Sequence, residues 1–141
     1  MRKFILAAAL AALGTAVLAS PAFAFDHHFT VLAKVKSIEP AGHNFFRFRD
    51  RLLDPNNRHD KVGRDHGKCR QKHRHIKCHG VVHLNGEIGG FGDIRFRGDL
   101  DPGDDHLVVT GGSGQFDGVA GKLTQHNVTE RITRYHFDLV R

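Results

Sequence analysis

A glycine-rich segment near the C-terminus restricts the fold of this chain more than any other part of its sequence. It occupies positions 108–122, reads VVTGGSGQFDGVAGK and carries five glycines. The residues at 108–110 favour a strand, and the glycines at 111–114 permit the positive φ of a tight reversal. The segment therefore predicts a β-hairpin that reverses at 111–114, with Gly118 and Gly121 inside the returning strand. Glycine within a strand marks a bulge or a close approach of neighbouring backbone, which suits a sheet that bends enough to close.

The spacing of these glycines excludes two nucleotide-binding motifs. A P-loop that ends at Gly121 requires another glycine five residues earlier, where Phe116 stands. A dinucleotide-binding fingerprint that begins at Gly112 requires glycine at the position of Asp117, and no amphipathic helix follows it. Nucleotide binding is not expected.

Alternating apolar and polar residues predict short strands through the rest of the chain. The candidate strands are 29–36, 45–53, 73–84, 87–100, 107–110, 122–128 and 131–140. The polar segment 54–65 is predicted to be an irregular connection, and the Asp-Pro-Gly-Asp sequence at 101–104 is predicted to be a turn. No stretch after residue 24 has a sustained helical period. The pattern predicts an all-β domain of about eight strands, as an antiparallel barrel or a sandwich.

The first 24 residues have the organisation of a secretory signal peptide. Arg2 and Lys3 form a basic start, an apolar run extends from Phe4 to Leu18, and an Ala-Phe-Ala sequence ends at Ala24. We therefore predict a signal peptide at residues 1–24 and one exported domain at 25–141, located in the extracellular space or the periplasm. The apolar run is too short to span a bilayer, so no membrane attachment is expected after the signal is removed.

Cys69 and Cys78 are the two cysteines of the chain. In an exported protein a disulfide between them is the default expectation. A hairpin tip between positions 70 and 77 places the two side chains across adjacent strands. Closing a loop this short stabilises the fold by about 2 to 3 kcal/mol.

Histidine is unusually frequent, with 12 in the chain. If the segment 73–84 is extended, four histidines point to one side of it: His73, His75, His79 and His83. Alternating histidines on a strand can bind zinc, copper or nickel. The alternative is a hydrated outer face, because no carboxylate or thiolate stands at a recognised ligand spacing from them.

The basic excess suggests an anionic partner but does not identify one. Without Arg2 and Lys3, 19 basic residues of the original 21 remain against 15 acidic ones, a net charge of +4 with neutral histidines. Most of the basic excess lies at 58–77. A solvated surface loop explains this run of charges as well as an anionic partner does. Nucleic acid is not an expected partner, since no recognition helix or aromatic stacking platform accompanies the charges.

The second candidate strand places an acid among aromatic rings. Phe46, Phe48 and Asp50 share one face, whereas arginines occupy the other. Desolvation there would raise the pKa of Asp50 and make it the candidate catalytic residue. The alternative places Asp50 at a barrel rim, paired with a neighbouring arginine in solvent. In each strand, the face that carries the apolar residues is predicted to line the interior of the barrel. The candidate ligand-binding residues on these faces are Phe46, Phe48, Ile94, Phe96, Tyr135, Phe137 and Leu139.

Four segments together resemble the allene oxide cyclase and dirigent superfamily. They are TGGSGQFDGVAG at 110–121, FRFRDRL at 46–52, VGRDHGKC at 62–69 and YHFDL at 135–139. The resemblance implies an eight-stranded antiparallel β-barrel that works without a cofactor. In this superfamily the cyclases hold a reactive lipid epoxide in a fixed conformation, and the dirigent proteins orient phenolic radicals made elsewhere. Asp50 matches the acidic position of the dirigent proteins, and Cys69 matches a cysteine near the cyclase pocket.

Three functions follow as hypotheses. The first is a cyclase or isomerase that acts on a small apolar molecule in the lumen. The second is a non-enzymatic, dirigent-like binder of such a molecule, and the third is a histidine-rich metal-binding exported protein. The partner expected in the first two is a small apolar ligand or substrate. The sequence leaves open whether the protein forms a homo-oligomer.

Overall fold

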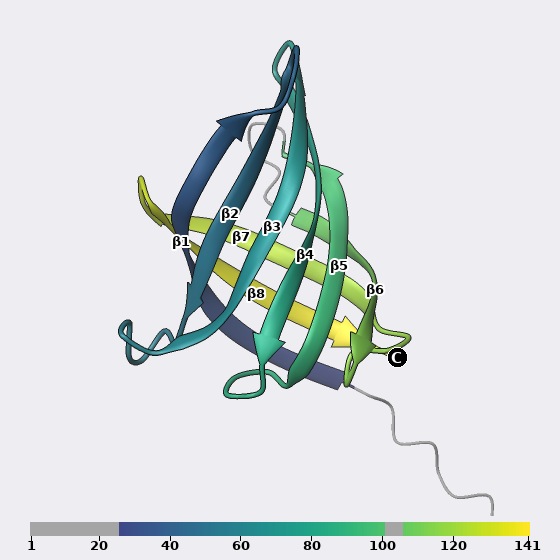
Figure 1. The fold of residues 1–141 in the computed structure, drawn as a ribbon. Coiled ribbons are helices and arrows are strands. Elements are labelled where there is room, and N and C mark those ends of the chain that lie inside the picture. The colour runs from purple at the N-terminus through teal and green to yellow at the C-terminus, as the bar shows by residue number, and fades with distance from the viewer. Residues whose placement is uncertain (1–25, 101–105) are drawn as a thin grey trace, which may run out of the picture.

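Eight antiparallel strands close into one barrel in which each strand pairs with its neighbours in sequence and β1 pairs with β8 (Figure 1). The computed structural model describes residues 26–100 and 106–141, so the predicted signal peptide and the predicted turn at 101–104 lie outside the described residues. The strands are β1 (Asp26–Pro40), β2 (Phe45–Leu53), β3 (Lys61–Lys72), β4 (His75–Asn85), β5 (Phe91–Asp99), β6 (His106–Gly114), β7 (Ala120–Thr129) and β8 (Ile132–Val140). The predicted fold class, an eight-stranded antiparallel barrel, is confirmed. The described residues form no helix, and so none that could span a membrane.

β1 is the strand that closes the barrel. Its residues 26–34 pair with β8, and its residues 32–40 pair with β2. The register shifts between Val35 and Ser37, which leaves one extra residue on β1. Such a bulge bends a strand and increases its twist, so β1 can turn from one neighbour to the other (Figure 1).

The prediction that 54–65 is irregular was wrong at its C-terminal end, because β3 begins at Lys61. The inward positions of β3 include Asp65 and Gly67, so the strand lacks the apolar alternation that reveals a strand in sequence. It is held instead by ladders on both sides, to β2 and to β4. The basic run of 58–77 is therefore mostly a hairpin rather than a loop.

The glycine-rich segment turns later than predicted. β6 continues to Gly114, and the reversal is at residues 115–119, where the amide of Val119 donates to the carbonyl of Phe116 at 3.3 Å. Gly118, which was predicted to lie in the returning strand, is in this turn with φ 73°. Gly121 is in β7 as predicted, and a Cβ there would clash with the carbonyl of Asp138. The predicted close approach of backbone is thus found at this glycine.

Aromatic rings fill one end of the barrel, which we call the packed end and define by the turns at 86–90 and 115–119. Phe29 stacks on Phe137 with ring centroids 4.7 Å apart, and Phe116 lies 6.2 Å from Phe29. Gly89 has φ 75°, and a Cβ there would lie 2.6 Å from the Phe29 ring. The 86–90 turn can therefore lie directly on the rings and close this end.

The opposite end carries the disulfide, and we define this disulfide end by the turns at 41–44 and 73–74. Cys69 of β3 lies directly opposite Cys78 of β4, and their sulfur atoms are bonded. The predicted disulfide is confirmed, and neither thiol is free. Next to it Gly67 faces Gly80, and a Cβ at Gly67 would clash with the ring of Phe48. The glycine pair therefore makes room for an aromatic ring on the inner face.

Candidate functional site

Two carboxyl groups face each other inside the barrel. Asp50 of β2 is the cross-strand partner of Asp65 of β3, and directly opposed residues of an antiparallel pair have Cβ atoms about 4.5 to 5.5 Å apart. Their exposed fractions are 9% and 2%, and they are the buried charged side chains of the described residues. The predicted alternative of a solvated Asp50 paired with arginine is not what the structure has, because Arg49 and Arg51 are exposed on the outer face.

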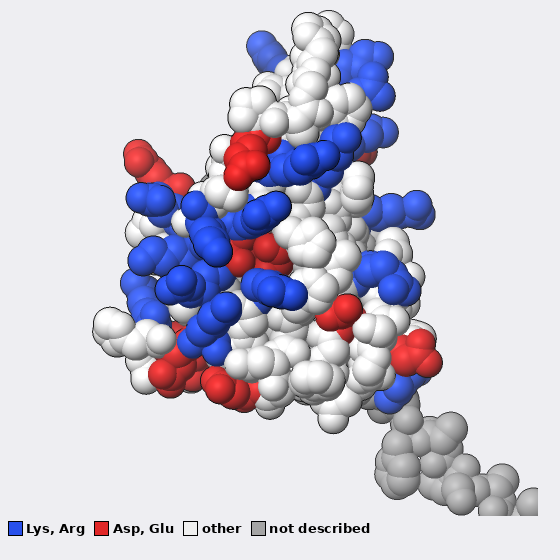
Figure 2. All heavy atoms as spheres, in the orientation of Figure 1, with Lys and Arg blue, Asp and Glu red and all other residues white. Residues whose placement is uncertain are grey.

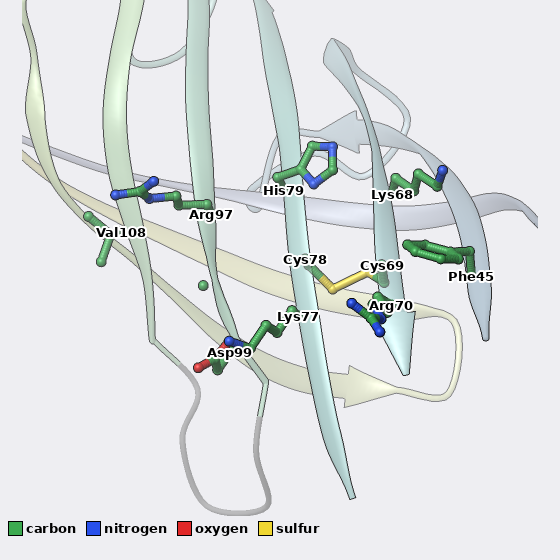
Figure 3. Close-up of a pocket in the computed structure, with 11 residues that line it drawn as sticks. Phe45, Lys68, Cys69, Arg70, Lys77, Cys78, His79, Arg97, Asp99 and Val108 are labelled. Carbon is green, nitrogen blue, oxygen red and sulfur yellow. A yellow bond between two sulfur atoms is a disulfide. The ribbon is translucent and has the colours of Figure 1, made fainter. Parts of the chain in front are cut away.

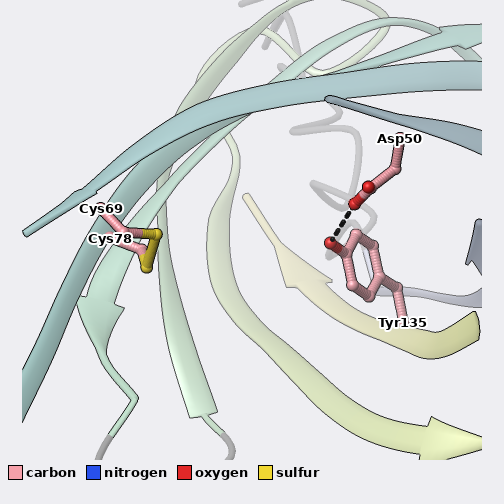
Figure 4. The surroundings of a disulfide bond; sticks show 4 residues. All are labelled: Asp50, Cys69, Cys78 and Tyr135. Atoms are coloured by element: carbon pink, nitrogen blue, oxygen red, sulfur yellow. Dashed lines mark hydrogen bonds between the residues drawn. A yellow bond between two sulfur atoms is a disulfide. The ribbon is translucent and has the colours of Figure 1, made fainter. Parts of the chain in front are cut away.

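Tyr135 completes this cluster from the far wall of the barrel. Its hydroxyl donates a long hydrogen bond of 3.4 Å to Oδ2 of Asp50 (Figure 4). The ring is buried and meets Phe137 edge to face at 6.4 Å. β8 thus brings the one tyrosine of the chain to the acid pair of β2 and β3.

Neither carboxylate oxygen of Asp65 makes a hydrogen bond of ordinary geometry within the part of the chain that the structure describes, although Asp50 and Tyr135 lie close enough to affect its pKa. A buried polar group without a partner costs about 1 to 3 kcal/mol, and more when it is charged. Such groups are rare in native proteins, and each calls for an explanation in terms of strain, catalysis or an unseen partner. Asp65 is therefore the strongest sign of a functional site in the lumen.

The surroundings of the cluster favour the protonated forms of its members. Burial raises the pKa of Asp50, and the protonated Asp65 carboxyl and the Tyr135 hydroxyl, acting as hydrogen-bond donors, lower that pKa by less. Burial raises the pKa of Asp65 well above its usual value, and the negative charge of Asp50 raises it further. Burial and the two carboxylates also raise the pKa of Tyr135, so its hydroxyl remains a proton donor. Two acids this close cannot both ionise easily, so the pair favours a state with one proton and one charge.

All seven apolar residues predicted for ligand binding face the interior, but they are not equally buried. Ile94, Phe96, Tyr135, Phe137 and Leu139 are buried in the continuous core. Phe46 and Phe48, on the inner face of β2, are only half-buried. Their role in binding stays a prediction, and the half-buried pair is the part of the set with surface left to offer a ligand.

Asp65 was missed by sequence analysis because it was assigned to the irregular segment. A signal for it was nevertheless available. Cys69 was predicted to pair across strands with Cys78, and counting back from Cys69 in steps of two reaches Asp65 on the same face. Extending the strand that contains Cys69 back to Asp65 would have predicted that both carboxyl groups lie inside the barrel.

The outer surface carries the basic excess. Lys and Arg gather over β1, β2 and β3 in the view of Figure 2. A groove of about 520 Å³ also crosses the outer face, where Lys68 Nζ lies 4.5 Å from the centroid of the Phe45 ring (Figure 3). The residues that line it are Phe45, Lys68, Cys69, Arg70, Lys77, Cys78, His79, Arg97, Gly98, Asp99 and Val108. It is separate from the acid pair, which lies on the inner side of the sheet.

The predicted metal-binding histidines project outward from the β3–β4 hairpin. His73 is in the turn with φ 57°, and His75, His79 and His83 follow on β4. His83 Nδ1 lies 2.6 Å from Oδ1 of Asp93, and its ring stacks on His66 at 5.1 Å. Metal binding by the predicted set stays a prediction.

The comparisons with known proteins support the fold. No protein-family model matches the chain, and no curated protein matches it. Among solved structures, a pyocyanin demethylase aligns with a TM-score of 0.61 and 23% identity, over 79% of this chain and 98% of that one. A nonspecific haem-binding cyclase of neoabyssomicin biosynthesis, which catalyses a cycloaddition, aligns with a TM-score of 0.58 and 13% identity, over 82% of this chain and 68% of that one. At these identities the likeness establishes the shared barrel alone.

Proposed function

We propose that this barrel binds a small, largely apolar molecule in its lumen and guides its cyclisation or isomerisation without a cofactor. The observation that carries the proposal is the buried acid pair, in which Asp65 makes no hydrogen bond of ordinary geometry and Asp50 accepts a hydrogen bond from Tyr135. Buried acids with raised pKa values cluster at catalytic sites, where proton transfer or charge stabilisation needs them.

The chemistry of the pair suits an isomerisation. The protonated acid or the Tyr135 hydroxyl can donate a hydrogen bond to a substrate oxygen as its bond to carbon breaks. The ionised acid can stabilise the positive charge that develops on carbon, in a lumen where few waters compete. An isomerisation conserves all atoms of the substrate, so it needs no co-reactant.

The resemblance to the allene oxide cyclase and dirigent superfamily supports the same class of reaction. Both kinds of protein act mainly through shape, and Asp50 stands at the acidic position of the dirigent proteins. The two structural neighbours are named for reactions on small molecules, which is compatible with a lumen that accepts a ligand. Export of the protein, which rests on residues 1–24, is part of the same proposal.

A second candidate function is non-enzymatic binding that orients a reactive intermediate made elsewhere. It is favoured by the half-buried Phe46 and Phe48, which offer apolar surface without any reacting group. The two functions differ in one respect: a passive template needs the aromatic surface but not the charge of the acid pair.

Enantiomeric excess of a cyclised product separates the two. A fatty-acid allene epoxide and a phenoxy radical, each generated in the same tube, give racemic products in water. We expect the wild-type protein to yield an excess of one enantiomer from one of them. Asp50→Asn and Asp65→Asn keep the shape of the side chains and are expected to abolish the excess while binding of the fluorescent apolar probe 1-aminoanthracene persists.

The other outcomes are equally informative. An excess that survives both acid substitutions but is lost in Phe48→Ala identifies a passive template. A wild-type protein that neither binds the probe nor alters the racemic product would contradict ligand binding in the lumen. Val108→Ala, at an exposed position of β6, serves as the matched apolar control because its side chain lies on the outer face of the barrel, whereas the acid pair lies on the inner face.

A further inference from the structure

A cluster of polar side chains lies on the outer surface where the first and last strands of the barrel meet. β1 and β8 run side by side (Figure 1), with His28 opposite Asp138 and Thr30 opposite His136. Directly opposed residues of an antiparallel pair point to the same face. Because alternate residues of β8 face the lumen, these four side chains gather on the outer face of this seam.

Three of them present metal-binding atoms at short range. Nδ1 of His28 lies 2.6 Å from Oδ1 of Asp138, and Nε2 of His136 lies 3.1 Å from the same oxygen. The three ligand atoms all lie within 4.8 Å of one another. The exposed fractions of the side chains are 55% for His28, 45% for His136 and 41% for Asp138. The cluster is therefore open to ions from solvent.

The atoms match the ligand set of a zinc-class ion. Zn²⁺ binds imidazole nitrogen at about 2.0 to 2.1 Å and carboxylate oxygen at about 2.0 to 2.2 Å, so tetrahedral ligand atoms stand about 3.3 Å apart. The nitrogen-to-oxygen distances at the seam are slightly shorter than this. Small rotations of exposed side chains would open the cluster enough for an ion, and water can occupy the fourth position.

Thr30 is placed to orient the ring of His136. Its Oγ1 lies 2.8 Å from Nδ1 of His136. When the Thr30 hydroxyl oxygen accepts a hydrogen bond from Nδ1–H of His136, Nε2 is left with a lone pair directed at the other two ligands. Ligating histidines are commonly oriented in this way by an acceptor on their second ring nitrogen.

We propose that His28, His136 and Asp138 form a binding site for one divalent zinc-class ion, with Thr30 positioning His136. The ion would join β1 to β8 and so fasten the barrel at its seam. His28 and Asp138 are 110 residues apart in sequence, so the unfolded chain does not hold the site together. A ligand that binds only the folded state stabilises it by mass action.

The β4 histidines provide an internal control for this site. His79 and His83 are four residues apart on one strand, which separates their Cα atoms by about 13 Å. Two ligands of one zinc ion are about 3.3 Å apart. The seam cluster instead draws its ligands from two strands at neighbouring positions, where the side chains converge.

Zinc binding to the chelator-treated protein can be measured by competition with a chromophoric chelator. We expect one Zn²⁺ per chain, a higher melting temperature with zinc, and the visible absorption of a four-coordinate site with Co²⁺. His28→Ala combined with His136→Ala should abolish all three signals. Thr30→Val should weaken binding by about 10-fold, the effect of losing an orienting partner. His79→Ala combined with His83→Ala should leave all three signals unchanged.

The substituted side chains lie on the outer face of the barrel, and circular dichroism of each variant confirms that the barrel has folded. The proposal is overturned if the wild-type protein takes up no zinc. It is equally overturned if the seam double variant binds zinc as the wild type does, or if the β4 double variant loses binding. Zinc uptake is independent of the lumen, so none of these results bears on the proposed reaction.

Discussion

The two ends of the lumen are built from the same inward alternation but differ in how completely it is buried. At the packed end Phe137 is fully buried, and the stacked Phe29 is 9% exposed. At the disulfide end Phe46 and Phe48 are half-buried, and Ile38 is 60% exposed. β2 to β5 rise beyond β7 and β8 there (Figure 1), so their inner faces lack an opposite wall. Facing inward therefore buries a side chain only where a second wall stands across the lumen.

The comparison predicts its largest effect at the packed end. Phe137→Ala should lower the free energy of unfolding by about 3 to 5 kcal/mol, because the cavity left in a filled core does not collapse. The matched substitution Phe46→Ala should cost about 1 kcal/mol or less, since its ring is already in partial contact with water. Urea unfolding of both variants measures the difference. Equal losses would show that the two ends are packed alike.

The disulfide should contribute less to the free energy of unfolding than the aromatic core does, but more than the exposed side chains around the disulfide. Cys69→Ser combined with Cys78→Ser should cost about 2 to 3 kcal/mol, from the loss of loop closure in the unfolded chain. The melting temperature of the variant, and of wild type with reductant, measures this. Because the bond joins two strands that are already paired, the variant should still form the barrel. A variant that does not fold would mean that the disulfide end depends on the bond for its structure.

The effect of the acid pair on stability depends on pH. The pKa of Asp65 is raised in the folded barrel, mainly by burial and then by Asp50, so between the ordinary value of 3.8 and the raised value the folded state binds more protons than the unfolded state. The free energy of unfolding then falls as pH rises through this window, by about 1.4 kcal/mol per unit of pKa elevation. The stabilisation is fully present below the unfolded pKa and lost above the folded one.

Asp65→Asn removes the titrating group. The free energy of unfolding of this variant should therefore fall less steeply than that of the wild type as pH rises above about 4. Thermal melts of both proteins across that range test this, with Asp117→Asn, at an exposed position of the 115–119 turn, as the control. An unchanged slope in Asp65→Asn would mean that the Asp65 carboxyl is not desolvated. It would also remove the main support for chemistry in the lumen.

The sequence predicted the features that depend on residues close to one another in the chain. The alternation of Phe46, Phe48 and Asp50 placed an acid on an inner face, and burial of Asp50 agrees with it. The spacing of Cys69 and Cys78 predicted their disulfide. β3 was not among the candidate strands, and the glycine turn was predicted too early, because glycine and aspartate at inward positions hide the apolar alternation of a strand.

Local periodicity determined that the chain would be all-β and which apolar residues would face inward, whereas the spacing of two cysteines in a chain expected to be exported predicted their disulfide. Only closure of the barrel decided which strands meet across it. Asp65 meets Asp50 through the register of β2 and β3, and Tyr135 reaches that pair because β8 forms the far wall. His28 meets Asp138 because β1 bends at its bulge and pairs with the last strand. Period-two alternation specifies a face for each side chain, but a register between strands distant in sequence is set by the packing of the whole sheet.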